Sequence, residues 1–330
     1  MGKDPNSGKR SEAGGIRVGL DLGGTKMYSA VFGESWKILG SARKPTEGHR
    51  GAEAGVERMV EVVLEALGEA GVDVKDVKAI GVGCPGVVDM KAGVLRSTPN
   101  LGWPDIKLEE VMGKRLGCRV GVFNDVDAGT FGEYVAGAGT GARSVLGVFP
   151  GTGVGAGFVY DGKLLRGRKY SAMEIGRMRW PAPGLGKPDG EWPNFESFCS
   201  RLAVASAAAA EGFRGNAPAL MKKSGTDISR IKSKALAASY EAGDEGTVRV
   251  IENALDYLCA GIGGVINLLG PDRVVLGGGL VEAMPKLFVN RVADGLVHYA
   301  ADELLEDLWV KEAELGDDAA VLGAAALAGR

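Results

Sequence analysis

The feature that most constrains the fold of this 330-residue chain is a series of four short motifs placed where predicted β-strands end. They span residues 21–26, 124–125, 151–157 and 277–280, and three of them are rich in glycine. The chain holds 54 glycines, roughly twice the usual share of about 7%. They are not periodic, which excludes collagen. Their clustering in short loops indicates backbone that must approach another group closely.

Apolar periodicity predicts alternating strands and helices in the first half of the chain. The first three strands follow one another directly, which is typical of an antiparallel meander. The expected order is strands 16–22, 27–32 and 36–41, helix 52–67, strand 77–82, helix 108–116, strand 119–123 and helix 125–135.

The second half has a similar mixture of elements, with a loop-like insert expected at residues 212–225. Mixed strands and helices in two similar halves predict an α/β protein with two domains. The expected order is strands 144–148 and 154–160, helices 194–210, 233–242 and 245–269, strand 273–276, helix 281–299, strand 308–314 and helix 318–328.

Charge and composition exclude several classes of protein. Lys plus Arg is 39 and Asp plus Glu is 42, and the net charge of −3 gives no support for a large nucleic-acid-binding surface. No stretch reaches the roughly 18 apolar residues of a membrane span. Residues 1–15 are polar and lack the apolar core of a secretory signal, so we expect a disordered tail there. The four cysteines form no C-x-x-C pair, which fits a reducing cytoplasm.

The first motif, residues 21–26, reads Asp-Leu-Gly-Gly-Thr-Lys between two strands. Gly23 and Gly24 leave backbone N–H groups able to face phosphate oxygens, and Thr25 adds a hydroxyl donor. Asp21, at the strand end, could hold a magnesium ion through water. A plain hairpin turn explains the same residues.

Two further glycine motifs have similar pairs of interpretations. Residues 151–157 could cradle phosphate, or could form a structural hairpin, since they continue into a strand and not into the helix that a dinucleotide fingerprint requires. Residues 277–279 follow a strand and precede a helix. That geometry lets a flat ring or a ribose lie against backbone, or simply makes a tight turn.

Asn124 and Asp125 stand directly after strand 119–123 and open a helix. An aspartate here could cap the helix. It could also act as a base at the carboxyl end of a strand, where α/β clefts form. The only histidines, His49 and His298, lie in none of these motifs, so a carboxylate is favoured as the base of an acid–base enzyme.

The order of the four motifs is that of the actin, Hsp70 and sugar-kinase superfold (ribonuclease H-like), in which nucleotide binds between two domains. From about residue 17 to the end, the chain resembles the ROK (repressor, open reading frame, kinase) family, whose enzymes phosphorylate hexoses and amino-hexoses. The resemblance implies an N-terminal domain of residues 16–135 with a closing helix at 318–330, and a C-terminal domain of residues 136–317. Matching segments besides the motifs are residues 81–89, 98–101, 162–167 and 316–325.

The resemblance also implies roles for individual residues. Asp125 would be the catalytic base. Asn100, Asn124 and Glu174 would hydrogen-bond sugar hydroxyls, and Glu196 would lie near the anomeric hydroxyl. The residues implied for ATP are Asp21, Gly23, Gly24, Thr25, Lys26, Gly151, Thr152 and Gly153 around the phosphates, with Asp21 also holding Mg²⁺ through water, and Gly277, Gly278 and Gly279 beside the nucleoside.

The chain departs from the family at the usual zinc site. Family members carry Glu-x-Gly-His and then Cys-x-Cys-Gly-x-x-Gly-Cys-x-Glu, whose His and three Cys bind a structural zinc. The corresponding residues here are Arg177, Lys187, Asp189 and Asn194. The two cations offer no lone pair, so we expect no zinc, and we expect prolines and the indoles of the 180–193 segment to replace it.

Arg177, which stands in place of the family's histidine, is therefore a candidate substrate-binding residue. It could pair with a nearby carboxylate of Glu174, Glu196 or Asp189. It could also contact an anionic group on the substrate, since a guanidinium suits carboxylate or phosphate.

The sequence therefore predicts a cytoplasmic, glucokinase-like enzyme that uses ATP and Mg²⁺ to phosphorylate a hexose or hexose-like sugar. By resemblance we expect a homodimer, with no nucleic-acid or membrane partner. Family repressors carry an N-terminal helix-turn-helix, and with only 15 polar residues before the first predicted strand we expect no DNA binding. The alternatives are a polyphosphate-dependent kinase, a non-catalytic sugar-sensing protein and a chaperone-like ATPase. Retention of Asp125 and of the sugar-binding positions disfavours the last two.

Overall fold

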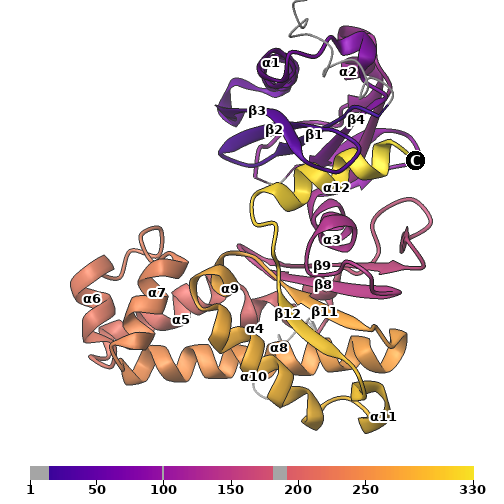
Figure 1. Ribbon diagram of the computed structural model, residues 1–330. Helices are drawn as coiled ribbons and strands as arrows, with labels where there is room; N and C mark the ends of the chain where they lie inside the picture. The colour runs from indigo at the N-terminus through magenta and orange to yellow at the C-terminus, as the bar shows by residue number, and fades with distance from the viewer. Residues whose placement is uncertain (1–14, 99, 181–191) are drawn as a thin grey trace, which may run out of the picture. The chain divides into compact units, whose positions relative to one another are not determined.

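The computed structural model describes residues 15–98, 100–180 and 192–330, and the chain divides into two units (Figure 1). Unit 1 comprises the residues up to Gly141 together with Gly157–Ala172 and Leu315–Arg330, and unit 2 comprises Ala142–Ala156 and Met173–Glu314. The predicted division assigned residues 136–141, 157–172 and 315–317 to the C-terminal domain, whereas here they pack with unit 1. The expected tail lies outside the described residues except for Gly15.

Unit 1 is built on a five-stranded sheet of order β3-β2-β1-β4-β7. β1 (Arg17–Leu22), β2 (Lys26–Phe32) and β3 (Ile38–Pro45) form the predicted antiparallel meander. β4 (Ala79–Cys84) runs parallel to β1, and β7 (Val120–Asn124) runs parallel to β4. Consequently β1, β4 and β7 all end at the same edge of the sheet, which is where α/β proteins place their ligands.

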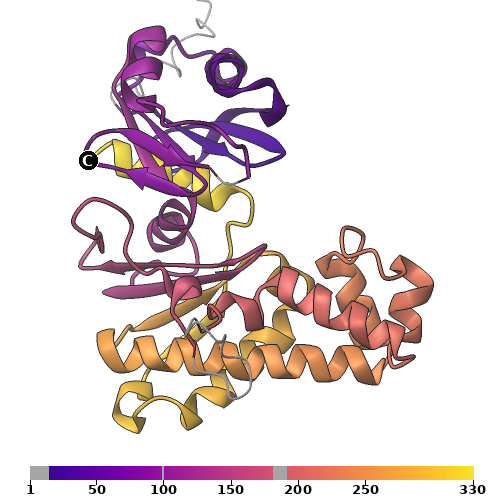
Figure 2. The same cartoon turned by 180° about the vertical axis from the view of Figure 1, so that it is seen from behind.

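Helices cover both faces of this sheet, as the views from the front and from behind show (Figures 1 and 2). α1 (Ala52–Ala70) and α2 (Leu108–Leu116) bury apolar side chains such as Met59 and Met112 on one face. α3 (Asp125–Ala136) and α12 (Asp318–Ala328) cover the other face. A Cβ atom at Gly81 would overlap the backbone of Ala324, so glycine in β4 is what lets α12 approach.

Short elements in unit 1 complete the chain between these layers. The sequence pattern did not reveal β5 (Val87–Asp89), β6 (Val94–Ser97) or β10 (Lys163–Leu164). Each has at most four residues, too few for a periodic signal. The 3-10 turns are η1 (Gly48–Arg50) and η2 (Val74–Asp76).

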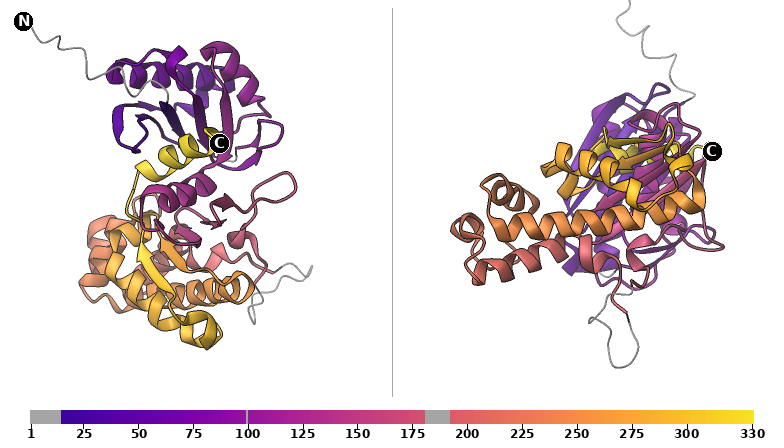
Figure 3. Two further views of the ribbon diagram at one scale, coloured as in Figure 1. Left: turned by 45° about the vertical axis from the view of Figure 1, so that its right-hand side comes forward. Right: turned by 90° about the horizontal axis from the view of Figure 1, so that it is seen from below.

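The second sheet has the order β10-β9-β8-β11-β12. β11 (Arg273–Leu276) runs parallel to both β8 (Ser144–Pro150) and β12 (Trp309–Glu312), and β9 (Val154–Tyr160) passes along the chain from unit 2 into unit 1. The long helix α8 (Glu245–Leu269) lies beside α5 (Arg201–Phe213) and α10 (Pro285–Gly295) (Figure 3). The remaining helices of unit 2 are α4 (Glu196–Cys199), α6 (Pro218–Ser224), α7 (Ser233–Glu241), α9 (Gly279–Ala283) and α11 (Asp302–Leu305), with η3 (Ile175–Arg177) and η4 (Leu296–His298).

Three predicted elements of unit 2 were wrong, each for a local reason. The helix expected over 194–210 breaks at Ser200, whose extended backbone (φ −72°, ψ 158°) lets its hydroxyl cap α5 by accepting a hydrogen bond from the Ala203 N–H at 3.2 Å. The expected loop at 212–225 contains α6, which starts with proline. The helix expected over 281–299 breaks at Met284 (φ −142°, ψ 54°), because a residue before proline is kept out of the helical region and Pro285 starts a new helix.

No helix in the described part of the chain is both long and apolar enough to cross a membrane.

Candidate active site

In unit 1, two carboxylates stand at the carboxyl edge of the first sheet. Asp21 is near the end of β1, and Asp125 begins α3 directly after β7. Gly83 of β4 pairs with Asp21, and a Cβ atom there would lie 3.7 Å from Asp125 Cα. Burial raises the pKa of Asp21 to about 7, and the negative charge of Asp125 adds to that rise. The structure therefore brings the two predicted carboxylates into one buried neighbourhood.

Asn124, and not Asp125, is the N-cap of α3. Its Oδ1 accepts hydrogen bonds from the backbone N–H groups of Val126 at 3.0 Å and Asp127 at 3.1 Å, while its Nδ2 donates to Gly86 O at 3.3 Å. Asp125 Oδ1 also accepts from the Val126 N–H, at 2.9 Å. The partial positive charge of the helix N-terminus stabilises an ionised carboxylate at this position, as a base requires.

The first glycine loop, residues 23–25, is set by the register of the hairpin that contains it. Leu22 pairs with Met27, which leaves a tight connection between β1 and β2. Thr46 fixes the loop from β3's end, since its Oγ1 donates to Gly23 O at 2.6 Å and its N–H donates to Thr25 O at 2.9 Å. Gly24 and Thr25 remain exposed to solvent, so the predicted phosphate contacts are sterically open.

Two neighbours complete this side of unit 1. Asn100 lies next to the loop, with its Cβ 3.8 Å from the position that a Cβ of Gly24 would occupy. Lys26 forms an ion pair with Asp317 at 2.7 Å. Lys26 would therefore have to leave this carboxylate, or share it, in order to contact a phosphate.

In unit 2, the second glycine loop is held by side chains from α4 and α5. Glu196 Oε2 accepts a hydrogen bond from the Val154 N–H at 3.2 Å. Arg201 binds the loop twice, since its backbone N–H donates to Gly151 O at 2.8 Å and its Nη2 donates to Thr152 Oγ1 at 3.3 Å. A Cβ atom at Gly153 would meet the carboxylate of Glu196, so a larger residue there would displace the end of that side chain.

Two of the predicted sugar-binding residues of unit 2, Glu174 and Arg177, flank Ile175 and Gly176. A Cβ atom at Gly176 would come within 3.1 Å of Oε2 of the third, Glu196. Arg177 Nε pairs with Glu174 Oε2 at 3.0 Å, which is one of the ion pairs that the sequence predicts. Glu196 also supports the glycine loop, which the sequence did not reveal.

A cavity of about 850 Å³ in unit 2 brings the second glycine loop and the glycine triplet together. Gly151, Thr152 and Gly279 line it. Gly278 has φ +82°, a backbone conformation that favours glycine, and its backbone lies against Pro150 at the end of β8. The size and the mixture of polar and apolar walls suit a nucleotide.

Several residues of this cavity were not predicted from the sequence. Arg201, Lys232 and Lys234 supply positive charge, and Leu202 and Ile228 supply apolar surface. The only local signal is the alternation of Lys232 and Lys234 just before a predicted helix, and that pattern is equally common on solvated surfaces.

The described residues that flank segment 181–191 pair with each other: the Trp180 N–H donates to Pro193 O at 2.9 Å and the Phe195 N–H donates to Met178 O at 2.8 Å. Trp180 packs on Phe195 with 5.3 Å between ring centroids. Trp192 is 41% exposed, so the expectation that it is buried is wrong.

The rest of that expectation lies outside the described residues, including Lys187, Asp189 and the prolines between them.

Comparison with known proteins identifies the family. The ROK family matches residues 17–330. The chain is 30% identical over 316 residues to the glucokinase of Thermotoga maritima, covering 94% of this chain and 96% of that protein. It is 30% identical to a ROK family glucokinase from Streptomyces griseus solved with glucose and AMPPNP, with a TM-score of 0.79 and coverage of 95% and 99%.

A ROK hexokinase from Thermus thermophilus is 29% identical, with a TM-score of 0.79 and coverage of 95% and 97%. These neighbours confirm the predicted two-domain fold of the actin and Hsp70 type. The chain belongs to the ROK family.

Proposed function

We propose that this protein is a sugar kinase, which transfers the γ-phosphoryl group of ATP to a hydroxyl of a hexose or hexose-like sugar. The observation that carries the proposal is the placement of Asp125 at the N-terminus of α3, beside the buried Asp21. Similarity to glucokinases over nearly the whole chain supports the same reaction.

Asp125 is the base in this proposal. The sugar hydroxyl oxygen forms a bond to the γ-phosphorus while the bond from that phosphorus to the β–γ bridging oxygen breaks, and the hydroxyl proton passes to the Asp125 carboxylate. Phosphoryl transfer has a loose transition state, so positioning and charge neutralisation supply most of the rate enhancement. A carboxylate suffices as base, because the proton leaves late in such a reaction.

Asp21 fits a magnesium ion held through water. Its carboxylate is buried next to that of Asp125, and a divalent cation would offset both the burial and the repulsion that raise its pKa. Among the described residues no three His, Cys, Asp or Glu side chains cluster as metal ligands. That sparse ligand set suits Mg²⁺, which keeps most of its waters. When bound, the ion neutralises charge on the phosphates.

The remaining predicted residues divide between the phosphoryl donor, ATP, and the phosphoryl acceptor, the sugar. We assign the phosphates to residues 23–26 of unit 1 and 151–153 of unit 2, and the nucleoside to the cavity beside residues 277–279. Arg201 holds the second loop in position and supplies a positive charge. The sugar is assigned to Asn100, Asn124, Glu174, Arg177 and Glu196.

The test is phosphoryl transfer by the purified full chain. Mg-ATP is supplied with a panel of hexoses and amino-hexoses, and both ADP and the sugar phosphate are measured. A parallel series replaces ATP with polyphosphate. We expect a sugar phosphate to form from ATP and at least one hexose. Binding of a sugar without transfer from either donor would contradict the proposal and support a sensing protein instead.

A further inference from the structure

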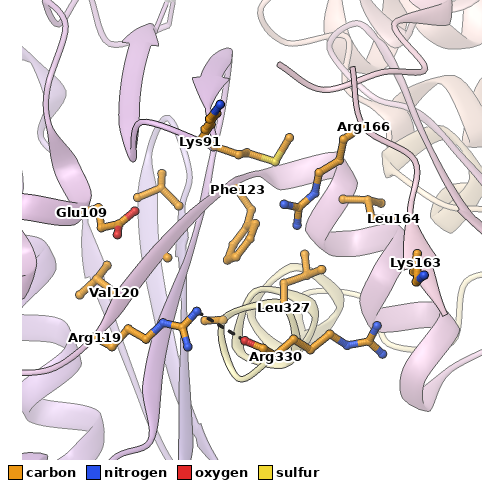
Figure 4. Close-up of a pocket in the computed structure, with 14 residues that line it drawn as sticks. Lys91, Glu109, Arg119, Val120, Phe123, Lys163, Leu164, Arg166, Leu327 and Arg330 are labelled. Atoms are coloured by element: carbon orange, nitrogen blue, oxygen red, sulfur yellow. Dashed lines mark hydrogen bonds between the residues drawn. The ribbon is translucent and has the colours of Figure 1, made fainter. Parts of the chain in front are cut away.

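A second cavity, of about 570 Å³, lies wholly within unit 1 (Figure 4). It follows β7, the edge strand of the first sheet, through residues 119–123. Its other walls are the turn after β5 at residues 90–91, the β10 loop at 163–166 and the end of α12. The loop belongs to the 162–167 segment that the sequence analysis singled out and that the proposed kinase reaction does not use.

The walls of this cavity are strongly cationic. Five basic side chains line it and only one acidic side chain does: Lys91, Arg119, Lys163, Arg166 and Arg330 against Glu109. Four separate segments of the chain contribute them, so the clustering is a product of the fold and not of a charged run. All five residues are exposed to solvent, so an anion that enters the cavity would meet their combined positive field.

Two of the basic side chains, those of Arg119 and Arg330, donate hydrogen bonds to main-chain oxygens. Arg119 Nη2 donates to the backbone oxygen of Arg330 at 3.4 Å. The Arg330 guanidinium lies 4.6 Å from the centroid of the Phe131 ring and donates to Gly162 O. Two acidic groups lie near these charges: Glu109 lines the cavity, and the negative charge of Asp127 acts on Arg166.

Among the basic side chains, that of Arg166 points into the cavity. Figure 4 shows its guanidinium turned toward Phe123 in the middle of the cavity, and it lies 5.6 Å from the centroid of that ring. Burial lowers the pKa of Arg166, and the negative charge of Asp127 acts in the opposite direction. Because an arginine pKa is above about 12, the group stays charged at neutral pH.

We propose that this cavity is a second ligand site, which binds a phosphate-bearing small molecule. Arg166 and Arg119 contact the phosphate, since a guanidinium offers paired donors that match its oxygens. Phe123, Leu164 and Leu327 form the apolar side, against which a carbon skeleton packs. The volume is within the range of about 300–1,000 Å³ that small-molecule sites occupy.

The site is adjacent to the proposed catalytic residues along one strand. β7 forms a wall of the cavity and ends at Asn124, directly before Asp125. A ligand bound against this strand is therefore placed to influence the position of the base. Binding itself does not depend on the kinase activity, so the two proposals fail independently.

The experiment measures binding by calorimetry with the full chain in excess AMPPNP, which occupies a nucleotide site if one exists. The probes are inorganic phosphate, pyrophosphate and glucose 6-phosphate, each at matched ionic strength in sodium chloride. We expect saturable binding of at least one probe, weakened about tenfold by Arg166→Gln and also weakened by Arg119→Gln, since each removes charged hydrogen bonds. The tightest probe identifies whether a free phosphate or a phosphate ester is the natural ligand.

Two controls locate the site. Lys37→Gln removes one exposed positive charge near β3, at the opposite edge of the sheet, and Lys232→Gln removes one from the cavity of unit 2. Both should leave the affinity for the probe unchanged. The proposal is overturned if no probe binds, or if neither Arg166→Gln nor Arg119→Gln weakens binding. The basic side chains would then serve only to protect an exposed strand edge from pairing with other chains.

Discussion

The two glycine loops resemble each other in sequence but are held in place by different means. The first, residues 23–25, is set by hairpin register and by Thr46, which bonds the loop through both its backbone and its hydroxyl. The second, residues 151–153, depends on Glu196 and Arg201, which lie more than 40 residues farther along the chain. Each loop accepts one hydrogen bond from a backbone N–H, that of Thr46 or Arg201. The difference lies in the side chains, since a neutral hydroxyl supports the first loop and charged groups support the second.

This difference predicts how each loop responds to mutation. Backbone hydrogen bonds survive most substitutions, so the first loop should tolerate changes in its neighbours. Charged side-chain hydrogen bonds are lost with the side chain, and they contribute more each, about 1.5–3 kcal/mol against about 1 kcal/mol for a neutral one. In the proposed reaction the charged groups near the first loop, Asp21 and Asp125, take part in the chemistry, whereas Glu196 and Arg201 also hold the second loop in place.

The largest effect on turnover should follow from changing Asp125, a carboxylate that does not hold either glycine loop. Asp125→Asn should lower kcat by about 10²-fold or more, the scale of a lost general base, and leave the melting temperature nearly unchanged. Steady-state kinetics and thermal unfolding of the same preparation measure both. Asp73→Asn, which alters an exposed carboxylate that caps η2, is the matched control. Turnover near that of the unmodified protein would rule out the catalytic role.

The next effect concerns the buried charge beside the first loop. Folding raises the pKa of Asp21 from 3.8 to about 7, so the folded protein binds a proton more tightly than the unfolded chain does. The resulting stabilisation is present below pH 4 and is lost as the pH rises to 7, by up to about 1.4 kcal/mol per unit. Asp21→Asn should lack this loss, so at pH 8 it should be more stable than the unmodified protein by up to about 4 kcal/mol, which is the slope taken over the roughly three units between the two pKa values.

Denaturant unfolding at pH 5 and pH 8 tests this difference. Magnesium should reduce the stability difference between Asp21→Asn and the unmodified protein at pH 8, since a bound cation favours the ionised carboxylate of the unmodified protein. If Asp21→Asn changes stability equally at both pH values, the carboxylate is not titrating in this window and the proposed metal position loses its support.

Removing one supporting side chain from each loop tests directly whether the two loops are held in different ways. Glu196→Ala should lower kcat/KM about tenfold, because the Val154 N–H loses its charged acceptor. Thr46→Val should lower it less than threefold, because the Thr46 N–H still binds Thr25 O. Glu196→Gln, which retains an acceptor oxygen, should restore part of the loss. A larger effect from Thr46→Val would show that the backbone does not hold the first loop.

The same contrast explains what could be predicted from sequence. Asp21 and Asp125 were found because strands end where ligands bind, and the bounds of α2, α8 and α12 follow from apolar spacing. Arg201 and Lys232 were missed because they reach their cavity only through the packing of α5 and α7. No short-range pattern carries that information. Ser200 and Pro285 are different, since their capping and breaking signals were present and apolar spacing was given more weight.

The smallest effect should come from Arg177, where the chain departs from its family. Its guanidinium pairs with Glu174 at 3.0 Å, and the two side chains are 59% and 49% exposed. Exposed ion pairs contribute about 0–1 kcal/mol, so Arg177→Ala should lower stability by less than about 1 kcal/mol and raise KM for a neutral hexose only a few-fold. Arg50→Ala, which breaks the similarly exposed pair with Glu47, is the matched control. A sugar with a carboxylate or phosphate substituent separates the two roles of Arg177. If Arg177→Ala abolishes turnover of such a sugar and spares neutral hexoses, then Arg177 recognises substrate charge and the pair with Glu174 is secondary.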